Sequence, residues 1–245
     1  MKPQSTILLI LCGVTMLLLN GCATRTPTIA HTHIGHALEG WHDTPNQAGL
    51  LVTAEQAAIV AHDAAKAAAK SDNDLATIKR NVQIVIDATI RNEPVPKGAD
   101  KYAVKNALID AISHIDFAAN SPDASANVKA LSKMLAEKLP QIVERCDLIG
   151  VLGQDILLAK STNEAALLTQ ELVNLTRDNL YGAEASGSAF GLAQVRSEIE
   201  STIAVEDPAY STVDRWYLFN LIQMPSGEWL FKQSDKGHSG DHRGY

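Results

Sequence analysis

The segment from residue 126 to residue 160 constrains the fold most, because its apolar residues recur every three or four positions. These residues are Val128, Leu131, Leu135, Leu139, Ile142, Cys146, Ile149 and Ile156. Such spacing places them on one face of an α-helix. A long amphipathic helix is stable only when other helices cover its apolar face. Pro140 lies inside the segment and is expected to kink the helix or split it in two.

The same period predicts further helices at residues 75–90, 100–119, 161 to about 180, and 192–203. Thr53-Ala-Glu-Gln56 and Ser161-Thr-Asn-Glu164 match the capping box that starts a helix. Between residues 54 and 69, nine of sixteen residues are alanine, the best helix former. Ser71 to Asp74 should end that helix and cap the next. Short connections between the helices predict a mainly α fold, an up-down antiparallel bundle over residues 53–206.

Aromatic residues gather near the C-terminus, where residues 210–231 hold six of the twelve in the chain. A turn at residues 224–228 predicts a short β-hairpin or aromatic cap over 207–232, with a helix at 213–223 as the competing interpretation. Trp216 and Trp229 either complete a core or form a docking patch for a protein partner. Residues 233–245 are polar and predict a disordered tail.

The N-terminus has the pattern of an export signal. Lys2 precedes an apolar run, residues 7–19, which is too short to span a membrane. The run ends in Leu-Leu-Leu-Asn-Gly-Cys, and residues 19–22 resemble the lipobox of bacterial lipoproteins, with Asn20 the less usual residue. The resemblance implies removal of residues 1–21 and lipidation of Cys22, with acyl chains such as palmitate holding the protein on a membrane.

The residue after Cys22 is Ala23, whereas in Gram-negative lipoproteins an Asp at this position favours retention at the inner membrane. The resemblance therefore implies an outer-membrane anchor with the body in the periplasm, or the outer face of the cell membrane in a Gram-positive source. Residues 22–30 are expected to form a tether. The segment HTHIGHALEGW, followed by an alanine-rich helix, is also similar to the start of some histidine-bearing periplasmic proteins of proteobacteria.

The charge of the chain limits which partners it can bind, and its cysteine content limits which disulfides it can form. The formal charge is −7, and loss of Lys2 with the signal makes it one unit more negative. An acidic body argues against nucleic-acid binding and against electrostatic adhesion to anionic lipid. Cys146 is the one cysteine left when Cys12 is removed and Cys22 is lipidated. No intrachain disulfide can then form, so stability must come from the hydrophobic core.

Four of the eight histidines lie close together in the segment 31–52: His31, His33, His36 and His42. Imidazole is the commonest metal ligand, which suggests a site for Cu, Zn or Ni, with haem b as a weaker alternative. In a helix, His33 and His36 share a face, as do His36 and Glu39. His62 and His114, on two predicted helices, are further candidate ligands. The spacing matches no established metal motif, so a purely structural role for the histidines is the alternative.

The sequence thus predicts a membrane-anchored lipoprotein whose helical domain binds a transition metal, as carrier, sensor or assembly factor. The alternative is a structural or interaction lipoprotein that holds an envelope protein partner. A P-loop, a Gly-x-Ser-x-Gly elbow and a Rossmann fingerprint are all absent from the sequence, so no enzymatic activity is indicated, and a hydrolase is the third interpretation.

Overall fold

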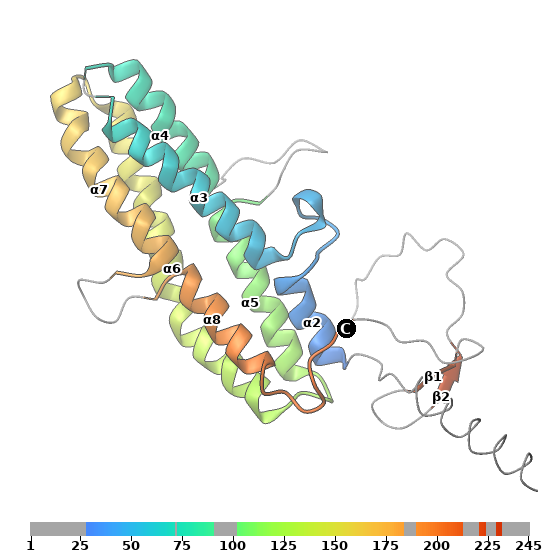
Figure 1. Cartoon of the computed structure of the whole chain (residues 1–245). Coiled ribbons are helices and arrows are strands. Elements are labelled where there is room, and N and C mark those ends of the chain that lie inside the picture. The colour runs from blue at the N-terminus through green and yellow to red at the C-terminus, as the bar shows by residue number, and fades with distance from the viewer. Residues whose placement is uncertain are drawn as a thin grey trace, which may run out of the picture. The chain divides into compact units, whose positions relative to one another are not determined.

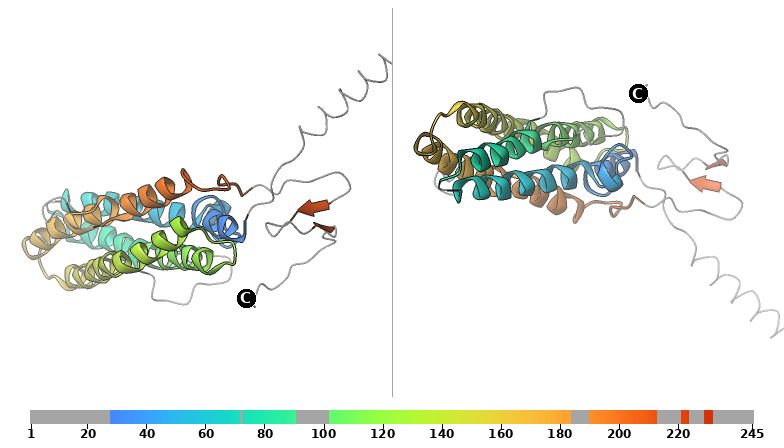
Figure 2. Two further views of the ribbon diagram at one scale, coloured as in Figure 1. Left: turned by 90° about the horizontal axis from the view of Figure 1, so that it is seen from below. Right: turned by 90° about the horizontal axis from the view of Figure 1, so that it is seen from above.

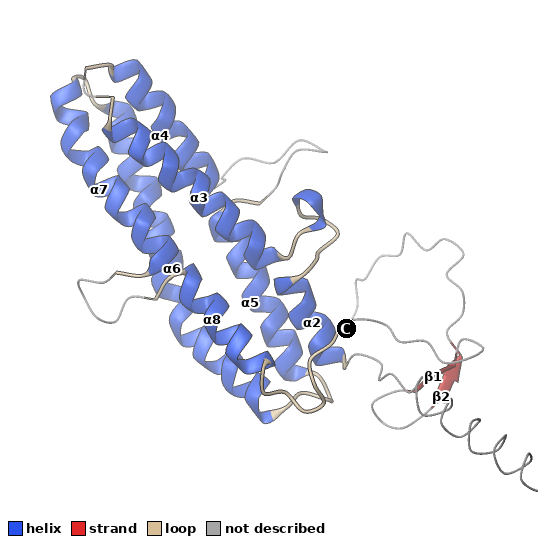
Figure 3. Cartoon of the chain, viewed as in Figure 1, coloured by secondary structure: helices blue, strands red, loops and turns tan. Residues whose placement is uncertain are grey.

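A computed structural model describes residues 28–71, 73–90, 102–183 and 190–212, and the backbone of residues 221–223 and 229–231. Helices dominate the described part of the chain, as predicted (Figure 3). They are α2 (Ile29–Leu38), α3 (Leu50–Ala69), α4 (Leu75–Thr89), α5 (Val104–Asn120), α6 (Ala126–Leu158), α7 (Thr162–Tyr181) and α8 (Leu192–Ile203), with the short 3-10 helix η2 (Pro45–Gln47) between α2 and α3. Among the helices described, none combines the length and the apolar character needed to cross a membrane.

The helices of residues 29–210 form a bundle of four columns (Figures 1 and 2). One column is α2 followed by α3, the second is α4 followed by α5, the third is α6 alone, and the fourth is α7 followed by α8. Consecutive columns run in opposite directions (Figure 1). α6 has 33 residues and runs along the helices of both neighbouring columns, packing on α4, α5, α7 and α8. At a rise of about 1.5 Å per residue it is roughly 50 Å long.

The hydrophobic core has two parts, which lie one after the other along α6. The first part joins α2, the start of α3, α5, the first half of α6, and α8; Leu108, Ile115 and Ile142 are fully buried there. The second joins the rest of α3, α4, the second half of α6, and α7. Buried alanines recur along α3 at Ala54, Ala58, Ala61, Ala65 and Ala68. Their small side chains let neighbouring helices approach closely, which explains the alanine bias of this segment.

Helix starts follow the predicted caps in two of three cases. The Asp74 carboxylate accepts the Thr77 backbone N–H at 3.0 Å, and the Ser161 hydroxyl accepts the Glu164 N–H at 3.2 Å. The predicted start at Thr53 is wrong, because α3 begins at Leu50 and the Thr53 hydroxyl instead donates to the Gly49 carbonyl at 3.0 Å. Leu50 and Leu51 are completely buried, so core packing extends the helix beyond its local signal.

Pro140 does not split the long helix, contrary to one of the two expected outcomes. α6 continues as a single element from Ala126 to Leu158. Pro140 lies on the exposed side, as does Ala136, whose carbonyl loses its helical hydrogen bond and can be solvated instead. The buried face continues on both sides of the proline, with Leu135 before it and Ile142 after it. Burial on that face holds the helix together where the proline weakens it.

Two contacts fix the position of α2. At its start, the backbone N–H groups of Ile29 and Ala30 donate to the carboxylate of Asp123, at 2.7 Å and 3.1 Å. Asp123 lies between α5 and α6, so it caps α2 from a distant part of the chain. At the other end, Gly49 packs so closely on the last turn of α2 that an added Cβ would lie 2.6 Å from the Leu38 carbonyl oxygen. α2 is thereby held along α5, which it contacts extensively.

Two short strands belong to a second unit, described by itself. β1 (Leu221–Gln223) pairs antiparallel with β2 (Trp229–Phe231), with Ile222 opposite Leu230. Most of the predicted hairpin or cap at 207–232, including Trp216, lies outside the described residues. The tail at 233–245 does so as well. Those parts of the interpretation therefore stay predictions.

Candidate metal centre

α2 presents two histidines one turn apart. His33 and His36 are separated by three positions, so their side chains lie on the same face of the helix. Their neighbours Ile34 and Ala37 are fully buried and hold α2 against the first core. Both histidine side chains are half-buried at the edge of that core. The local spacing predicted this pair, and the packing of α2 along α5 decides what it faces.

α5 supplies the third histidine. His114 Nδ1 lies 3.3 Å from His33 Nδ1 and 3.4 Å from His36 Nδ1. One nitrogen from each of the three rings lies within 4.8 Å of the other two. Within the described residues, these three form the one group of His, Cys, Asp or Glu side chains with this geometry. Three nitrogens from two helices thus converge on one point.

Hydrogen bonding alone does not satisfy this arrangement. A neutral imidazole nitrogen carries either one hydrogen or one lone pair in the ring plane. His114 Nδ1 can therefore form one good hydrogen bond, although it has two nitrogen neighbours at 3.3 and 3.4 Å. In a tetrahedral zinc site with Zn–N bonds of about 2.0–2.1 Å, two ligand nitrogens stand about 3.3–3.4 Å apart. Two of the three nitrogen pairs, those that include His114, are thus spaced as tetrahedral coordination requires, and the third pair lies within 4.8 Å.

Two aromatic side chains flank the three imidazoles. The Trp41 ring lies 4.7 Å from the His36 ring and 4.6 Å from the His114 ring, centre to centre. The Phe117 ring lies 5.6 Å from His33 and 5.7 Å from His114. These walls keep the imidazoles in place and limit the water that reaches them. Neither residue was among the site residues predicted from the sequence, although Phe117 is one helical turn after His114.

The loop after α2 holds Trp41 at the site. The Trp41 backbone N–H donates to the Ala48 carbonyl at 3.2 Å, which closes the loop between α2 and α3. The Thr44 hydroxyl donates to the Trp41 carbonyl at 2.7 Å. The indole is therefore fixed by backbone contacts on both sides of its Cα atom.

Burial keeps the site in the protonation state that a metal needs. Desolvation, together with repulsion from His36 and His33, lowers the pKa of His114 to about 4. Desolvation also lowers the pKa of His33, partly offset by the carboxylate of Asp123. Both imidazoles are neutral at physiological pH. A metal ion therefore has no proton to displace from either ring.

These shifts predict how the stability of the metal-free protein depends on pH. The unfolded chain takes up a proton at His114 near the ordinary value of 6.5, whereas the folded chain resists it until about pH 4. The contribution of His114 to the free energy of unfolding should be fully present above pH 6.5 and fall between pH 6.5 and 4. One such group contributes at most about 1.4 kcal/mol per pH unit, and a half-exposed ring contributes less.

Urea unfolding at pH 7.0 and pH 5.0 measures this dependence, with His114→Gln as the comparison. The wild type should lose more stability than the variant over that interval. An equal loss in both proteins would show that His114 is not the group responsible.

Four other predicted ligands lie elsewhere. His31 is buried, with its Nε2 atom 3.4 Å from a Glu206 carboxylate oxygen. His42 is exposed and lies 3.2 Å from Asp43. His62 forms a 3.0 Å hydrogen bond between its Nδ1 atom and the Thr176 hydroxyl. Glu39 is exposed, and its carboxylate adds to the effect of burial, which raises the pKa of the Tyr210 phenol. Of the predicted set, His33 and His36 are brought together with His114, and the others are not.

Cys146 is the buried hydrophobic residue that the sequence predicted. Its thiol is fully buried, and burial raises its pKa to about 11. The Asn179 amide lies 3.3 Å from its sulfur. A protonated thiol in such a position is a poor ligand and a poor nucleophile. Cys22 and Trp216 lie outside the described residues, and only the backbone of Trp229 is described.

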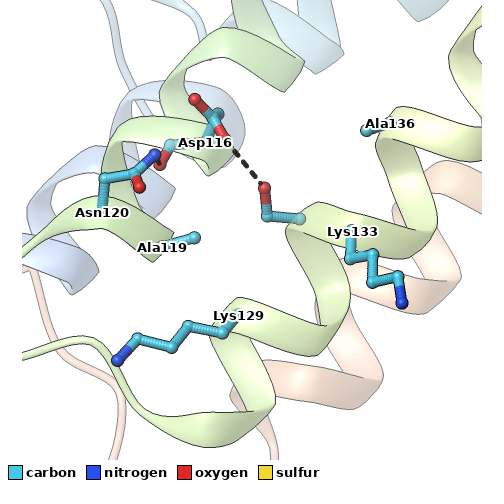
Figure 4. Close-up of a pocket in the computed structure, with 7 residues that line it drawn as sticks. Asp116, Ala119, Asn120, Lys129, Lys133 and Ala136 are labelled. Carbon is cyan, nitrogen blue, oxygen red and sulfur yellow. Dashed lines mark hydrogen bonds between the residues drawn. The ribbon is translucent and has the colours of Figure 1, made fainter.

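A shallow groove on another part of the surface is separate from the histidines. It lies between α5 and α6, and Asp116, Asn120, Ser132 and the two lysines Lys129 and Lys133 line it (Figure 4). The Ser132 hydroxyl donates to the Asp116 carboxylate at 3.1 Å. None of the three clustered histidines lines this groove.

Comparisons with known proteins leave the chain without a family assignment. No protein-family model, no curated protein and no solved structure matches it.

Proposed function

We propose that this protein is a lipid-anchored envelope protein whose helical bundle binds one transition metal ion through His33, His36 and His114. The observation that carries the proposal is the convergence of three imidazole nitrogens, with two Nδ1–Nδ1 distances of 3.3 and 3.4 Å. An exported protein with such a site can act as a metal carrier, as a metal sensor or in the assembly of a metalloprotein. All three roles need metal that is bound and released.

Zinc fits these distances better than the other candidates. Square-planar coordination, which Cu²⁺ and Ni²⁺ favour, brings neighbouring nitrogens to about 2.9 Å. Haem iron is held by one axial histidine or by two ligands on opposite faces of the porphyrin. The three imidazoles contact one another, with ring centres 4.9–5.7 Å apart, so a porphyrin has no room between them. We therefore propose that the site binds a metal ion in tetrahedral coordination and not a haem.

The purified chain, freed of metal by a chelator, tests this function. Zinc, copper, nickel and haem are added separately, and the mass of the intact complex is recorded by native mass spectrometry. We expect one zinc ion per chain and no haem. A protein that takes up none of the metals would overturn the proposal and favour the interaction role instead.

The membrane anchor has its own prediction. Replacing Cys22 by serine should abolish incorporation of labelled palmitate and move the protein from the membrane fraction to the soluble fraction, because the sulfur that carries the lipid is lost. Cys12→Ser is the matched control, since Cys12 lies within the proposed signal peptide and should leave labelling unchanged. Labelling of the Cys22→Ser variant would contradict a lipid on this residue.

A further inference from the structure

We infer that the metal bound by His33, His36 and His114 keeps a fourth coordination position, and that this position takes a small monoanion such as thiocyanate or azide. The inference rests on the proposed function and adds to it the chemistry of the exchangeable ligand. It makes the centre a site for an external ligand and not only a structural cross-link between α2 and α5.

The number of protein ligands is the first argument. Within the described residues, no fourth His, Cys, Asp or Glu joins the three histidines. His42 is close in sequence, but its ring is directed to Asp43 and packs on the Trp41 ring, with centres 4.4 Å apart. Zinc held by three histidines normally completes its tetrahedron with water or another external ligand. The described protein residues thus provide three of four positions.

The charge of the site is the second argument. Three neutral imidazoles leave the double positive charge of the metal uncompensated, which favours an anion as the fourth ligand. No described carboxylate joins the three histidines. Asp123 acts on His33 from outside the group, and its carboxylate accepts the N–H groups at the start of α2. Asp116 accepts a hydrogen bond from the Ser132 hydroxyl in the groove between α5 and α6.

The surroundings are the third argument. Trp41 and Phe117 wall the imidazoles and bring no charge of their own. A charge in an apolar, half-buried setting is weakly screened, so its attraction for a counter-ion is stronger than in water. Phe117 is 49% exposed, and His33, His36 and His114 are also partly accessible. A small anion can therefore reach the metal from solvent, and a large one would contact the aromatic rings.

Cobalt provides the test, because the visible absorption of Co²⁺ reports its coordination number and its ligands. The metal-free full chain is loaded with one equivalent of Co²⁺ and titrated with sodium thiocyanate or azide. We expect an absorption spectrum typical of tetrahedral Co²⁺ that changes with anion concentration and saturates at one anion per metal. Sodium perchlorate at the same ionic strength should leave the spectrum unchanged. The His42→Ala variant should behave as the wild type does.

The outcomes separate the inference from the function on which it rests. A bound Co²⁺ whose spectrum does not respond to either anion means that the fourth position is already filled by the protein, and this overturns the inference but not metal binding. A chain that binds no Co²⁺ and, in the mass measurement above, no zinc overturns both.

Discussion

Replacing His114 by alanine is expected to weaken zinc binding by more than 100-fold. His114 is the one ligand that α5 contributes, and its Nδ1 atom is the nitrogen that lies near both others, at 3.3 and 3.4 Å. Without it, two imidazoles remain on α2, and such a pair leaves half of a tetrahedral ion to solvent. Loss of a residue that only orients a metal ligand costs about 10–100-fold, so loss of a ligand should cost more.

Two matched histidine variants control for general effects on the protein. His62→Ala removes a histidine on α3 that bonds to Thr176, and His42→Ala removes one beside Trp41. Both should bind zinc within about twofold of the wild type, measured by competition with a chromophoric chelator. Wild-type affinity in the His114→Ala variant would contradict the assignment of the site. A similar loss in the His42→Ala variant would instead mean that the exposed ring is a ligand.

Replacing Gly49 by alanine is expected to destabilise the fold by about 3 kcal/mol and to weaken zinc binding. The new Cβ atom would lie 2.6 Å from the Leu38 carbonyl oxygen and 2.8 Å from that of Ala37. These are backbone atoms at the end of α2, which no side-chain rotation can move. Overpacking usually costs about 1–3 kcal/mol, and a clash with backbone should fall at the upper end. Because α2 carries His33 and His36, relief of the clash by moving α2 would disturb the site.

Ala48→Gly is the matched control, since it exchanges the same two residue types one position away without adding an atom. Extra flexibility should lower its stability by no more than about 1 kcal/mol. The free energy of unfolding from urea titration and the zinc affinity are compared across the wild type and both variants. If Gly49→Ala matches Ala48→Gly in both measurements, the close approach of α2 and α3 does not support the centre.

The helices could be predicted from the sequence because their signals are local. The recurrence of apolar residues every three or four positions predicted the helices α4 to α8. Asp74 and Ser161 predicted two helix starts, which the structure confirms. Where tertiary packing decided, local signals failed. α3 begins three residues before the capping box, because Leu50 and Leu51 are buried. Pro140 is tolerated because it is exposed and the buried face continues around it.

The site was half predictable for the same reason. His33 and His36 are one turn apart on one helix, a relation that needs no tertiary information. His31 is two positions from His33, about 200° around the helix, and therefore faces Glu206 instead. His42 follows the helix end, so its position depends on a loop. Whether His114 or His62 joins the pair depends on which helix packs on α2, and the spacing of apolar residues does not predict that packing.

X-ray absorption at the zinc edge of the loaded protein tests the central claim most directly. The account predicts three imidazole nitrogens at about 2.0–2.1 Å, with the outer-shell scattering typical of histidine rings and one further light atom. The His114→Ala variant should not retain the metal, so the scattering from histidine rings around zinc should be lost as well. A spectrum with sulfur at about 2.3 Å, or with fewer than three imidazoles, would contradict a zinc centre formed by His33, His36 and His114.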